Sequence, residues 1–288
     1  MIVVTGASGQ LGRQIVEDLL RYRPASQVAV SVRDPDKCED LAKLGVRVRH
    51  GDFADVNSLA QSFEGATQML MVSSNARATG GDTLAQHKNA IDGAKAIGVE
   101  RIVYTSQIAA NASSAFPPAH DHAATEDFLA NSGLKWTALR NGFYAASGAS
   151  MLGPWGQTGK IEAPPDGKVS WTAHSDLAAA AAIILTQDER FEGPTPPLVG
   201  PEALDFADLA MIVSDIAGAS VDRQTLTDDQ LTANIRARGA PEQVARLALG
   251  YFIASRAGEF SSPDDTLGQI LGRPLITMRD VLVQKGKN

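Results

Sequence analysis

The chain has 288 residues, of which 44% are hydrophobic and 20% charged, with a formal net charge of −7. This composition is ordinary for a globular protein and leaves room for a nucleotide-binding domain and a smaller lobe. The negative charge argues against nucleic acid or an anionic membrane as the main partner, and the single Cys38 excludes an intrachain disulfide.

Residues 1–20 combine an apolar, β-branched segment, a glycine turn and a helical pattern. Residues 1–5 predict a strand, and residues 13–20 show helical spacing beyond Gly6, Gly9 and Gly12. Such a turn brings backbone N–H groups and a helix N-terminus together, where a pyrophosphate can be held. The glycines would turn the chain sharply, admit phosphate oxygens and let the helix pack on the strand. We therefore predict a dinucleotide site, with an ordinary βα turn as the alternative.

The residue after the second predicted strand, residues 28–32, indicates which dinucleotide binds. An NAD-selective site has a carboxylate near this point, about 20 residues past the glycines, for the ribose 2′-hydroxyl. Here Arg33 comes first, and a guanidinium can bind a 2′-phosphate through two hydrogen bonds. Asp34 and Asp36 follow and could reach the 2′-hydroxyl instead, or all three could be solvated loop charges. The sequence favours NADPH, and NADH stays open as the alternative cofactor.

Strands and helices alternate along the first half of the chain. Further strands are predicted at 46–52, 69–74, 101–106 and 135–140, and helices at 35–44, 57–63, 84–97 and 125–131. Repeated βα units with near-continuous apolar strands predict a parallel sheet covered on both faces. We therefore expect an α/β fold: a Rossmann-type doubly wound parallel sheet with a smaller, mainly helical C-terminal lobe.

The alternation stops near residue 143. Residues 148–167 are rich in glycine and proline and predict a loop, followed by a helix at 175–185 and a short strand at 197–200. Helices are expected at 206–217, 228–238 and 242–254, with a short one at the C-terminus. We assign residues 1–142 to a Rossmann domain, completed by elements from about 169–200. Residues 143–168 and 201–288 form the predicted substrate-binding lobe.

Five short segments carry a family resemblance. Residues 5–12, 32–34, 51–53, 104–106 and 139–144 together resemble the NmrA-like atypical short-chain dehydrogenases. Within that family the chain looks most like the group of type 2 NAD(P)H:quinone oxidoreductase and triphenylmethane reductase, as residues 24–27 and 122–126 also do. The resemblance spans nearly the whole chain and is most specific before residue 145. It implies bound NADPH and hydride transfer to a quinone-like or dye-like acceptor in a cleft under the C-terminal lobe.

The resemblance also implies roles for cofactor-binding residues. The pyrophosphate would lie against Gly6, Ala7, Ser8, Gly9, Gln10 and Leu11, and the 2′-phosphate against Arg33. Adenine would lie at Asp52 and Phe53, and the nicotinamide ribose at Ser73 and Ser74. As alternatives, Asp52 caps the helix after it, and the two serines bond to nearby backbone.

Residues after the sixth predicted strand should line the cleft. Asn141 and Gly142 are expected on the nicotinamide side, and Phe143 and Tyr144 could stack on a planar acceptor. The alternative for Phe143 is core packing. His174 would touch the cofactor phosphate or the substrate. Trp155 and Trp171 would wall the pocket or, more commonly for tryptophans in loops, anchor a loop.

The catalytic pair of ordinary short-chain dehydrogenases is missing. They use Tyr-x-x-x-Lys, yet none of Tyr22, Tyr104, Tyr144 and Tyr251 has lysine four residues on. Reactions that need this base are therefore not expected, whereas a quinone accepts hydride with little help. The catalytic candidates are Tyr144 and His122, with capping or solvation as the alternative for His122.

Metal is not expected. His120-Asp121-His122 lacks a third ligand at typical spacing, and these residues enter a predicted helix. The leading hypothesis is thus an NADPH-dependent reductase of quinone-like or other conjugated planar acceptors. The alternative is an NADP(H)-binding redox sensor without turnover. We expect a small-molecule substrate, no nucleic acid and no membrane, leave a homodimer open, and expect a cytosolic location because no basic leader or long apolar span is seen.

Overall fold

The computed structural model describes residues 1–187 and 191–285. The chain divides into two compact units, the first drawing on residues 1–107, 121–140 and 174–196 and the second on 108–120, 141–173 and 197–288. The second unit thus takes in residues 108–120, 141–142, 169–173 and 197–200, which the sequence assigned to the Rossmann domain. The substrate-binding role of the second unit stays a prediction.

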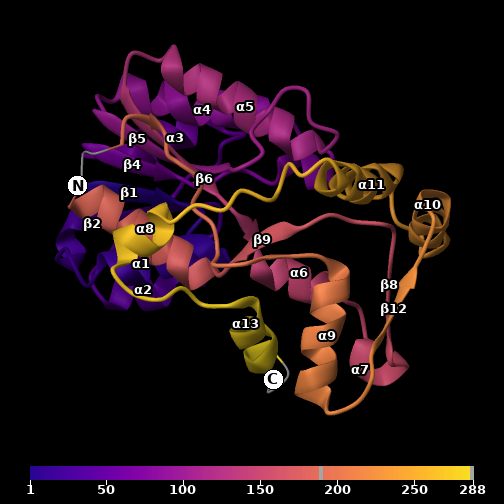
Figure 1. Cartoon of the computed structure of the whole chain (residues 1–288). Helices are drawn as coiled ribbons and strands as arrows, with labels where there is room; N and C mark the ends of the chain where they lie inside the picture. The colour runs from indigo at the N-terminus through magenta and orange to yellow at the C-terminus, as the bar shows by residue number, and fades with distance from the viewer. Residues whose placement is uncertain (188–190, 286–288) are drawn as a thin grey trace. The chain divides into compact units, whose positions relative to one another are not determined.

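The first unit is built on a seven-stranded sheet with the order β10-β6-β5-β4-β1-β2-β3 (Figure 1). Its strands are β1 (Ile2–Thr5), β2 (Val28–Val32), β3 (Arg47–His50), β4 (Gln68–Met71), β5 (Arg101–Gln107), β6 (Lys135–Asn141) and β10 (Gly193–Pro194). The pairs with a defined register all run parallel. The strand order reverses between β1 and β4, so their carboxyl ends form the switch point where such sheets bind ligands.

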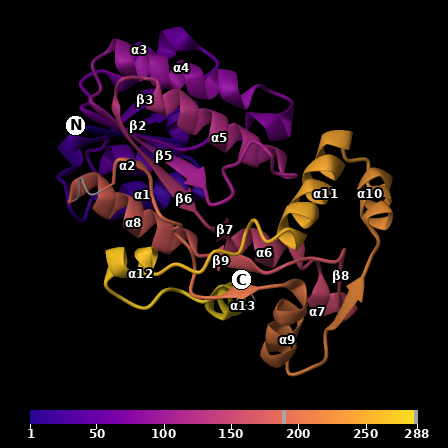
Figure 2. The same ribbon diagram turned by 45° about the horizontal axis from the view of Figure 1, so that its top comes forward.

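Helices cover both faces of this sheet (Figure 2). One layer contains α1 (Gln10–Leu19), α2 (Glu39–Lys43) and α8 (His174–Thr186), and the other α3 (Val56–Phe63), α4 (Thr83–Ala96) and α5 (Pro117–Ala130). Helix α1 packs against α8, and α3 packs against α4. Every residue of β1 and β2 is buried, because both faces of the sheet are covered. The predicted doubly wound α/β fold is confirmed.

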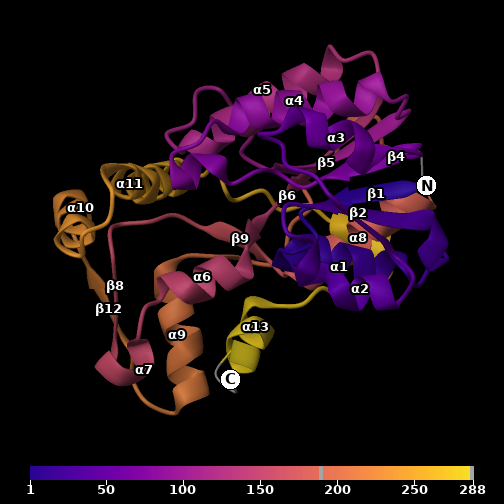
Figure 3. The same ribbon diagram turned by 180° about the vertical axis from the view of Figure 1, so that it is seen from behind.

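The second unit is mainly helical, as predicted, with two small sheets. Its helices are α6 (Ala145–Met151), α7 (Trp155–Thr158), α9 (Phe206–Ala217), α10 (Asp228–Ala237), α11 (Glu242–Arg256), α12 (Thr266–Leu271) and α13 (Met278–Lys285). Strands β7 (Phe143–Tyr144), β9 (Val169–Thr172) and β11 (Ala203–Leu204) form one sheet. The other pairs β8 (Lys160–Ala163) with β12 (Asp222–Thr225), two parallel strands that Figure 3 shows side by side.

Local signals explain why α9 has its predicted bounds. The Asp205 carboxylate accepts from the N–H groups of Ala207 and Asp208, and the Asp208 carboxylate accepts from the Asp205 N–H. Gly218 ends the helix with a φ of +64°, a left-handed conformation that favours glycine. A reciprocal capping box and a terminal glycine therefore fix both ends.

Three predictions of local structure are wrong. The segment 148–167 is not one loop, since it contains most of α6 together with α7 and β8. Its glycines lie at turns between these short elements; Gly153 and Gly159, for example, have positive φ. No strand covers 197–200; Leu198 makes only an isolated bridge to Asn141, and the last strand of the large sheet is β10. The helix predicted at 125–131 begins eight residues earlier, at Pro117, where proline suits a first helical turn.

Among the described residues, none of the helices combines the length and the apolar character needed to span a membrane.

Candidate cofactor site

The predicted glycine turn connects β1 to α1. Gly6 adopts a φ of +67°, and the Gly9 N–H donates to the Gly6 carbonyl at 2.9 Å. Helix α1 then begins at Gln10 with Gly9 as its N-cap, so no side chain caps it, and its first turn carries no acidic residue. The N–H groups and positive end of the helix dipole are thus left uncompensated by side chains, as an anion site requires.

The three glycine positions of the turn differ in whether the fold requires glycine there. Gly6 needs its positive φ. A Cβ on Gly12 would lie 2.4 Å from the Gly6 carbonyl oxygen, so Gly12 lets the helix pack against the turn. A Cβ on Gly9 would meet only that same oxygen, at 3.4 Å, and its φ of −93° suits any residue. The protein fold itself therefore does not require glycine at position 9.

The remaining turn residues divide by exposure. Ala7 and Leu11 are buried and offer a ligand only their backbone. Ser8 and Gln10 are exposed. Of the six residues predicted to hold the pyrophosphate, Gly6 and Ser8 line the cavity described next.

A cavity of about 450 Å³ lies at the carboxyl ends of β1, β2, β3 and β4. Seven residues predicted to bind the cofactor line it together: Gly6, Ser8, Arg33, Asp52, Phe53, Ser73 and Ser74. The sequence had not indicated eleven further lining residues: Thr5, Ser31, Val32, Gly51, Val72, Asn75, Ala76, Thr79, Gly80, Gly81 and Gln86. This volume is in the range of natural small-molecule sites.

Arg33 is an exposed cation at the cavity with no hydrogen bond or ion pair from its guanidinium to any described residue. Arg13, by contrast, is held by both carboxylate oxygens of Asp40 at 2.9 and 2.7 Å. The carbonyl of Arg33 is bonded to the His50 ring at 3.0 Å, which fixes the backbone while leaving the side chain free. Asp34 pairs with Lys37 at 3.4 Å and does not line the cavity. A free guanidinium at this position suits a phosphate dianion.

Asp52 and Phe53 follow β3. The Asp52 carboxylate accepts from the Ala54 N–H at 2.9 Å, a local turn bond. It does not cap α3, because Asp55 does so by accepting from the Asn57 N–H at 3.1 Å. The capping alternative for Asp52 is therefore wrong, although part of its acceptor capacity is used within its turn.

Ser73 and Ser74 follow β4. The Ser74 hydroxyl donates to Gln86 Oε1 at 2.5 Å and accepts from the Ala76 N–H at 3.1 Å. Ser73 Oγ accepts from the Tyr104 hydroxyl at 3.4 Å. Both serines line the cavity. Ser74 also bonds to nearby backbone, which was the alternative to a ligand-binding role, whereas Ser73 Oγ bonds to the side chain of Tyr104.

His122 is half-buried on α5 and bonded through Nδ1 to the Tyr104 hydroxyl at 2.8 Å. Burial lowers the pKa of His122 to about 4, so the ring is neutral at pH 7. The side chains of its two neighbours have other partners. His120 bonds to the Ser114 carbonyl, and Asp121 pairs with Arg77 at 2.5 Å. Among the described residues no group of three or more His, Cys, Asp or Glu could hold a metal.

The other predicted cleft residues occupy the second unit, apart from half-buried His174, which begins α8 and does not line the cavity. Asn141 is buried, and its Oδ1 has no partner among the described atoms. Close packing explains why residue 142 is glycine, since a Cβ there would lie 2.2 Å from Thr172 Oγ1. Burial raises the pKa of the Tyr144 phenol to about 12.

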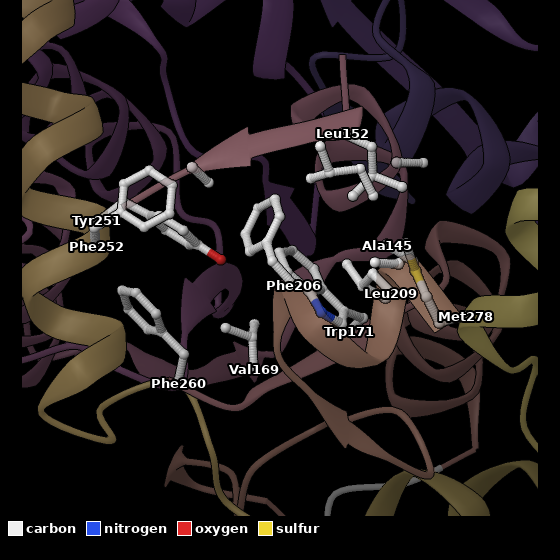
Figure 4. Close-up of a cluster of buried hydrophobic side chains, with 14 of the residues drawn as sticks. Ala145, Leu152, Val169, Trp171, Phe206, Leu209, Tyr251, Phe252, Phe260 and Met278 are labelled. Atoms are coloured by element: carbon white, nitrogen blue, oxygen red, sulfur yellow. The ribbon is translucent and has the colours of Figure 1, made fainter. Parts of the chain in front are cut away.

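Phe143 contributes to an aromatic core cluster in this unit. Its ring lies 4.8 Å from Phe260, 5.0 Å from Tyr251 and 5.9 Å from Trp171, centroid to centroid. Figure 4 shows part of the cluster, in which Trp171, Tyr251 and Phe260 converge from β9, α11 and the segment after it. Core packing thus explains Phe143. Trp171 is a strand residue buried to 1% exposure, and Trp155 packs at the edge of the cluster.

The fold and cavity define a dinucleotide-binding α/β protein, and the chain belongs to the NAD(P)H-binding family, which it matches over residues 6–188. It is 34% identical to quinone oxidoreductase 2 of Escherichia coli over 97% of this chain and 96% of that protein. It is 26% identical to the NAD(P)H azoreductase of Xenophilus azovorans, over 97% and 96%.

Two solved structures are similar along essentially their whole length. The Citrobacter sp. triphenylmethane reductase complexed with NADP(H) matches with a TM-score of 0.89 and 33% identity, covering 99% of each chain. The E. coli quinone oxidoreductase complexed with NADPH matches with a TM-score of 0.89 and 33% identity, covering 100% of each. The predicted family and the predicted class, an NAD(P)H-dependent oxidoreductase, are confirmed.

Two features account for six of the eleven lining residues that the sequence analysis missed. Gly51 belongs to a motif already noted, and its reason is close packing, because a Cβ there would lie 2.2 Å from Ser31 Oγ. Asn75, Ala76, Thr79, Gly80 and Gly81 come from the loop between β4 and α4. The glycine pair at 80 and 81, between the strand predicted at 69–74 and the helix predicted at 84–97, was the available signal for this part of the wall.

Proposed function

We propose that the protein is an NADPH-dependent reductase that transfers hydride to quinone-like or other conjugated planar acceptors. The observation that carries this proposal is the cavity of the first unit, whose lining includes the open glycine turn, the free Arg33 guanidinium and the two serines Ser73 and Ser74. The likeness to quinone, dye and azo reductases supports the acceptor class.

The residues of the cavity fit a dinucleotide phosphate. The room beside Gly9 and the uncapped start of α1 suit the pyrophosphate, and the unpaired Arg33 side chain suits the 2′-phosphate. Asp52 and Phe53 would take the adenine, and Ser73 and Ser74 the ribose at the other end. When bound, the nicotinamide supplies the hydride. The roles expected of Asn141 and Gly142 on the nicotinamide side, and of His174 at the cofactor phosphate or the substrate, remain proposals drawn from the sequence, because none of the three lines the cavity.

The protein supplies binding and orientation rather than a dedicated acid. The neutral His122 ring and the weakly acidic Tyr144 phenol, with pKa values of about 4 and about 12, are both poor sources of a proton at pH 7. A quinone needs no prior protonation to accept hydride, and water can protonate the product. Proximity to a well-oriented nicotinamide then provides most of the rate enhancement.

The test is turnover with a panel of acceptors. Purified protein is mixed with NADPH or NADH and with quinones, triphenylmethane dyes, azo dyes or simple aldehydes, and loss of the reduced-cofactor absorbance is followed. We expect quinones to be reduced with NADPH preferred, and aldehydes to be inert. Tight NADPH binding without turnover of any acceptor would favour the redox sensor instead, and rapid aldehyde reduction would overturn the donor-free mechanism.

A further inference from the structure

The segment that follows β4 is held by side chains where strand pairing has ended. Within the sheet, the pairing of β4 with β1 ends at Leu70, and its pairing with β5 ends at Met71. Beyond that point the Val72 N–H donates to Thr5 Oγ1 at 2.9 Å, and the Ser73 N–H to Thr105 Oγ1 at 2.9 Å. Then the Ser74 N–H donates to His87 Nε2 at 2.8 Å. Three successive amides are thus accepted by side chains from three different elements.

Two of these acceptors lie outside the cavity. Val72, Ser73 and Ser74 line it, and so does Thr5, but Thr105 and His87 do not. Thr105 is 2% exposed and His87 is fully buried on α4. These two side chains therefore cannot touch a ligand in the cavity, and they act on it only through the segment that they hold.

The hydrogen bonds around His87 fix its tautomer. Thr125 Oγ1 donates to the Asp121 carbonyl at 2.6 Å, so its single proton is already used. The His87 Nδ1, 2.7 Å from the same oxygen, must then be the donor in that contact. Nε2 is left without a proton and accepts from Ser74. The ring is therefore neutral and has both nitrogens satisfied.

The surroundings of the ring keep it neutral. The Tyr104 ring packs against it in a T-shaped arrangement with centroids 5.4 Å apart, and His122 and Asp121 are the titratable groups close enough to act on its charge. Burial, followed by the influence of His122, lowers the pKa of His87 to about 3. A proton on Nε2 would turn the Ser74 contact into a meeting of two donors.

We propose that His87 and Thr105 are positioning residues, which hold the Val72–Ser74 backbone as a rigid wall for the nicotinamide half of the cofactor. The inference rests on the proposed NADPH site and names the groups that preorganise it. Because these two side chains act on the half that NADPH and NADH share, they should affect both cofactors equally. Arg33, at the 2′-phosphate end, should affect NADPH alone.

The variants are chosen as matched pairs. Thr105→Val deletes the hydroxyl with little change of shape, and Thr105→Ser keeps it. His87→Leu deletes the acceptor for Ser74, whereas His87→Gln retains an oxygen near the Nε2 position. Removing one such acceptor from a buried amide should weaken binding about tenfold.

Dissociation constants for NADPH and NADH are measured well below the melting temperature, beside amide hydrogen exchange of Ser73 and Ser74. We expect Thr105→Val and His87→Leu to weaken both cofactors about tenfold and to expose the amide that each one held. Thr105→Ser and His87→Gln should stay within about threefold of wild type. If His87→Leu does not fold, the Thr105 pair alone decides the matter.

The outcomes separate the two proposals. Unchanged dissociation constants in folded Thr105→Val and His87→Leu, with only a lower melting temperature, would overturn the positioning role and leave the NADPH site intact. Failure of wild-type protein to bind either cofactor would overturn the proposed function itself. Weaker binding of NADPH alone would also contradict the inference, because the effect would then lie at the 2′-phosphate end.

Discussion

In the first unit, polar groups without protein partners face a cavity, whereas in the second unit aromatic rings face one another. Arg33 and the start of α1 are left available at a 450 Å³ space. In the second unit, four rings instead pack on one another at centroid distances from 4.8 to 6.4 Å; they belong to Phe143, Trp171, Tyr251 and Phe260. An exposed guanidinium and the uncapped N–H groups of a helix can bind an anion, while packed rings bury apolar surface. From this contrast we expect the first set to serve ligand binding and the second to serve stability.

The largest expected effect tests whether position 9 is reserved for the ligand. Gly9→Val should abolish measurable NADPH binding, a loss of at least about a hundredfold, because branched methyl groups would fill the approach to the helix N-terminus. The fold should remain, since a Cβ at this position has room. Titration with NADPH and a circular dichroism melt check both statements.

Gly12→Ala is the matched control. Its Cβ would lie 2.4 Å from the Gly6 carbonyl oxygen, so this variant should lose stability rather than binding alone. If Gly9→Val binds NADPH at wild-type affinity, the pyrophosphate does not lie at this turn.

A core substitution tests the other side of the comparison. Phe260 is fully buried, stacks on Tyr251 at 5.4 Å and packs against Phe143. Phe260→Ala should cost about 4 kcal/mol of unfolding free energy through the cavity it leaves, and Phe260→Leu clearly less. Urea unfolding measures the loss. The NADPH dissociation constant of the folded variant should not change; a large change would mean that the cluster also serves the cofactor.

Arg33→Ala should weaken NADPH by about 2–3 kcal/mol, the scale of a lost charge-assisted interaction, and leave NADH nearly unchanged. NADH binding should hardly change, because the guanidinium has no partner among the described residues whose loss could disturb the site. Isothermal titration with both cofactors measures the difference. Arg238→Ala, which removes an exposed arginine at the end of α10, is the control. Equal losses for NADPH and NADH would remove the basis for NADPH preference.

Acid should destabilise the first unit through His87. Its pKa is about 3 in the folded protein and near 6.5 when unfolded, so the unfolded state takes up the proton first as the pH falls. Stability is complete above about pH 6.5 and declines from there toward pH 3, by about 2 kcal/mol at pH 5 for this one group. His122 titrates in the same range, so the wild type is compared with His87→Gln. Urea unfolding at pH 7.5 and pH 5 should show a smaller acid loss in the variant; an equal loss would contradict the buried neutral ring.

The sequence predicted the first unit better than the second for physical reasons. The strand at 28–32 and the middle of the strand at 101–106 are mostly apolar and β-branched, and the glycine turn between a strand and a helix is a local signal. The elements within 148–167 are only four to seven residues long, too short to show a period. The last strand holds only Gly193 and Pro194 at the sheet edge, where proline is tolerated and no apolar run marks it.

The same distinction applies to the candidate site. Gly6, Ser8, Arg33 and Asp52 could be found because each lies within three residues of the end of a strand, and parallel strands bring their carboxyl ends to one edge. His87 and Thr105 could not, because their role depends on which amides they meet after folding. Phe143 was ambiguous in the sequence, since an aromatic residue after a strand suits a pocket wall and a core equally well.

The smallest expected effect concerns Tyr144, the one aromatic residue of this segment whose hydroxyl favours a role beyond packing. Tyr144→Phe should keep most quinone turnover, a change below about 1 kcal/mol in kcat/KM, because the ring remains and a phenol with a pKa of about 12 is a poor acid. Tyr144→Ala should raise KM for bulky acceptors by losing uniform binding to a flat molecule.

His122→Ala should reduce quinone turnover only slightly, because water can protonate the product. Steady-state kinetics with a small and a bulky quinone separate these effects. A loss of more than about a hundredfold in kcat from Tyr144→Phe or His122→Ala would reveal a dedicated proton donor and make carbonyl reduction the natural reaction.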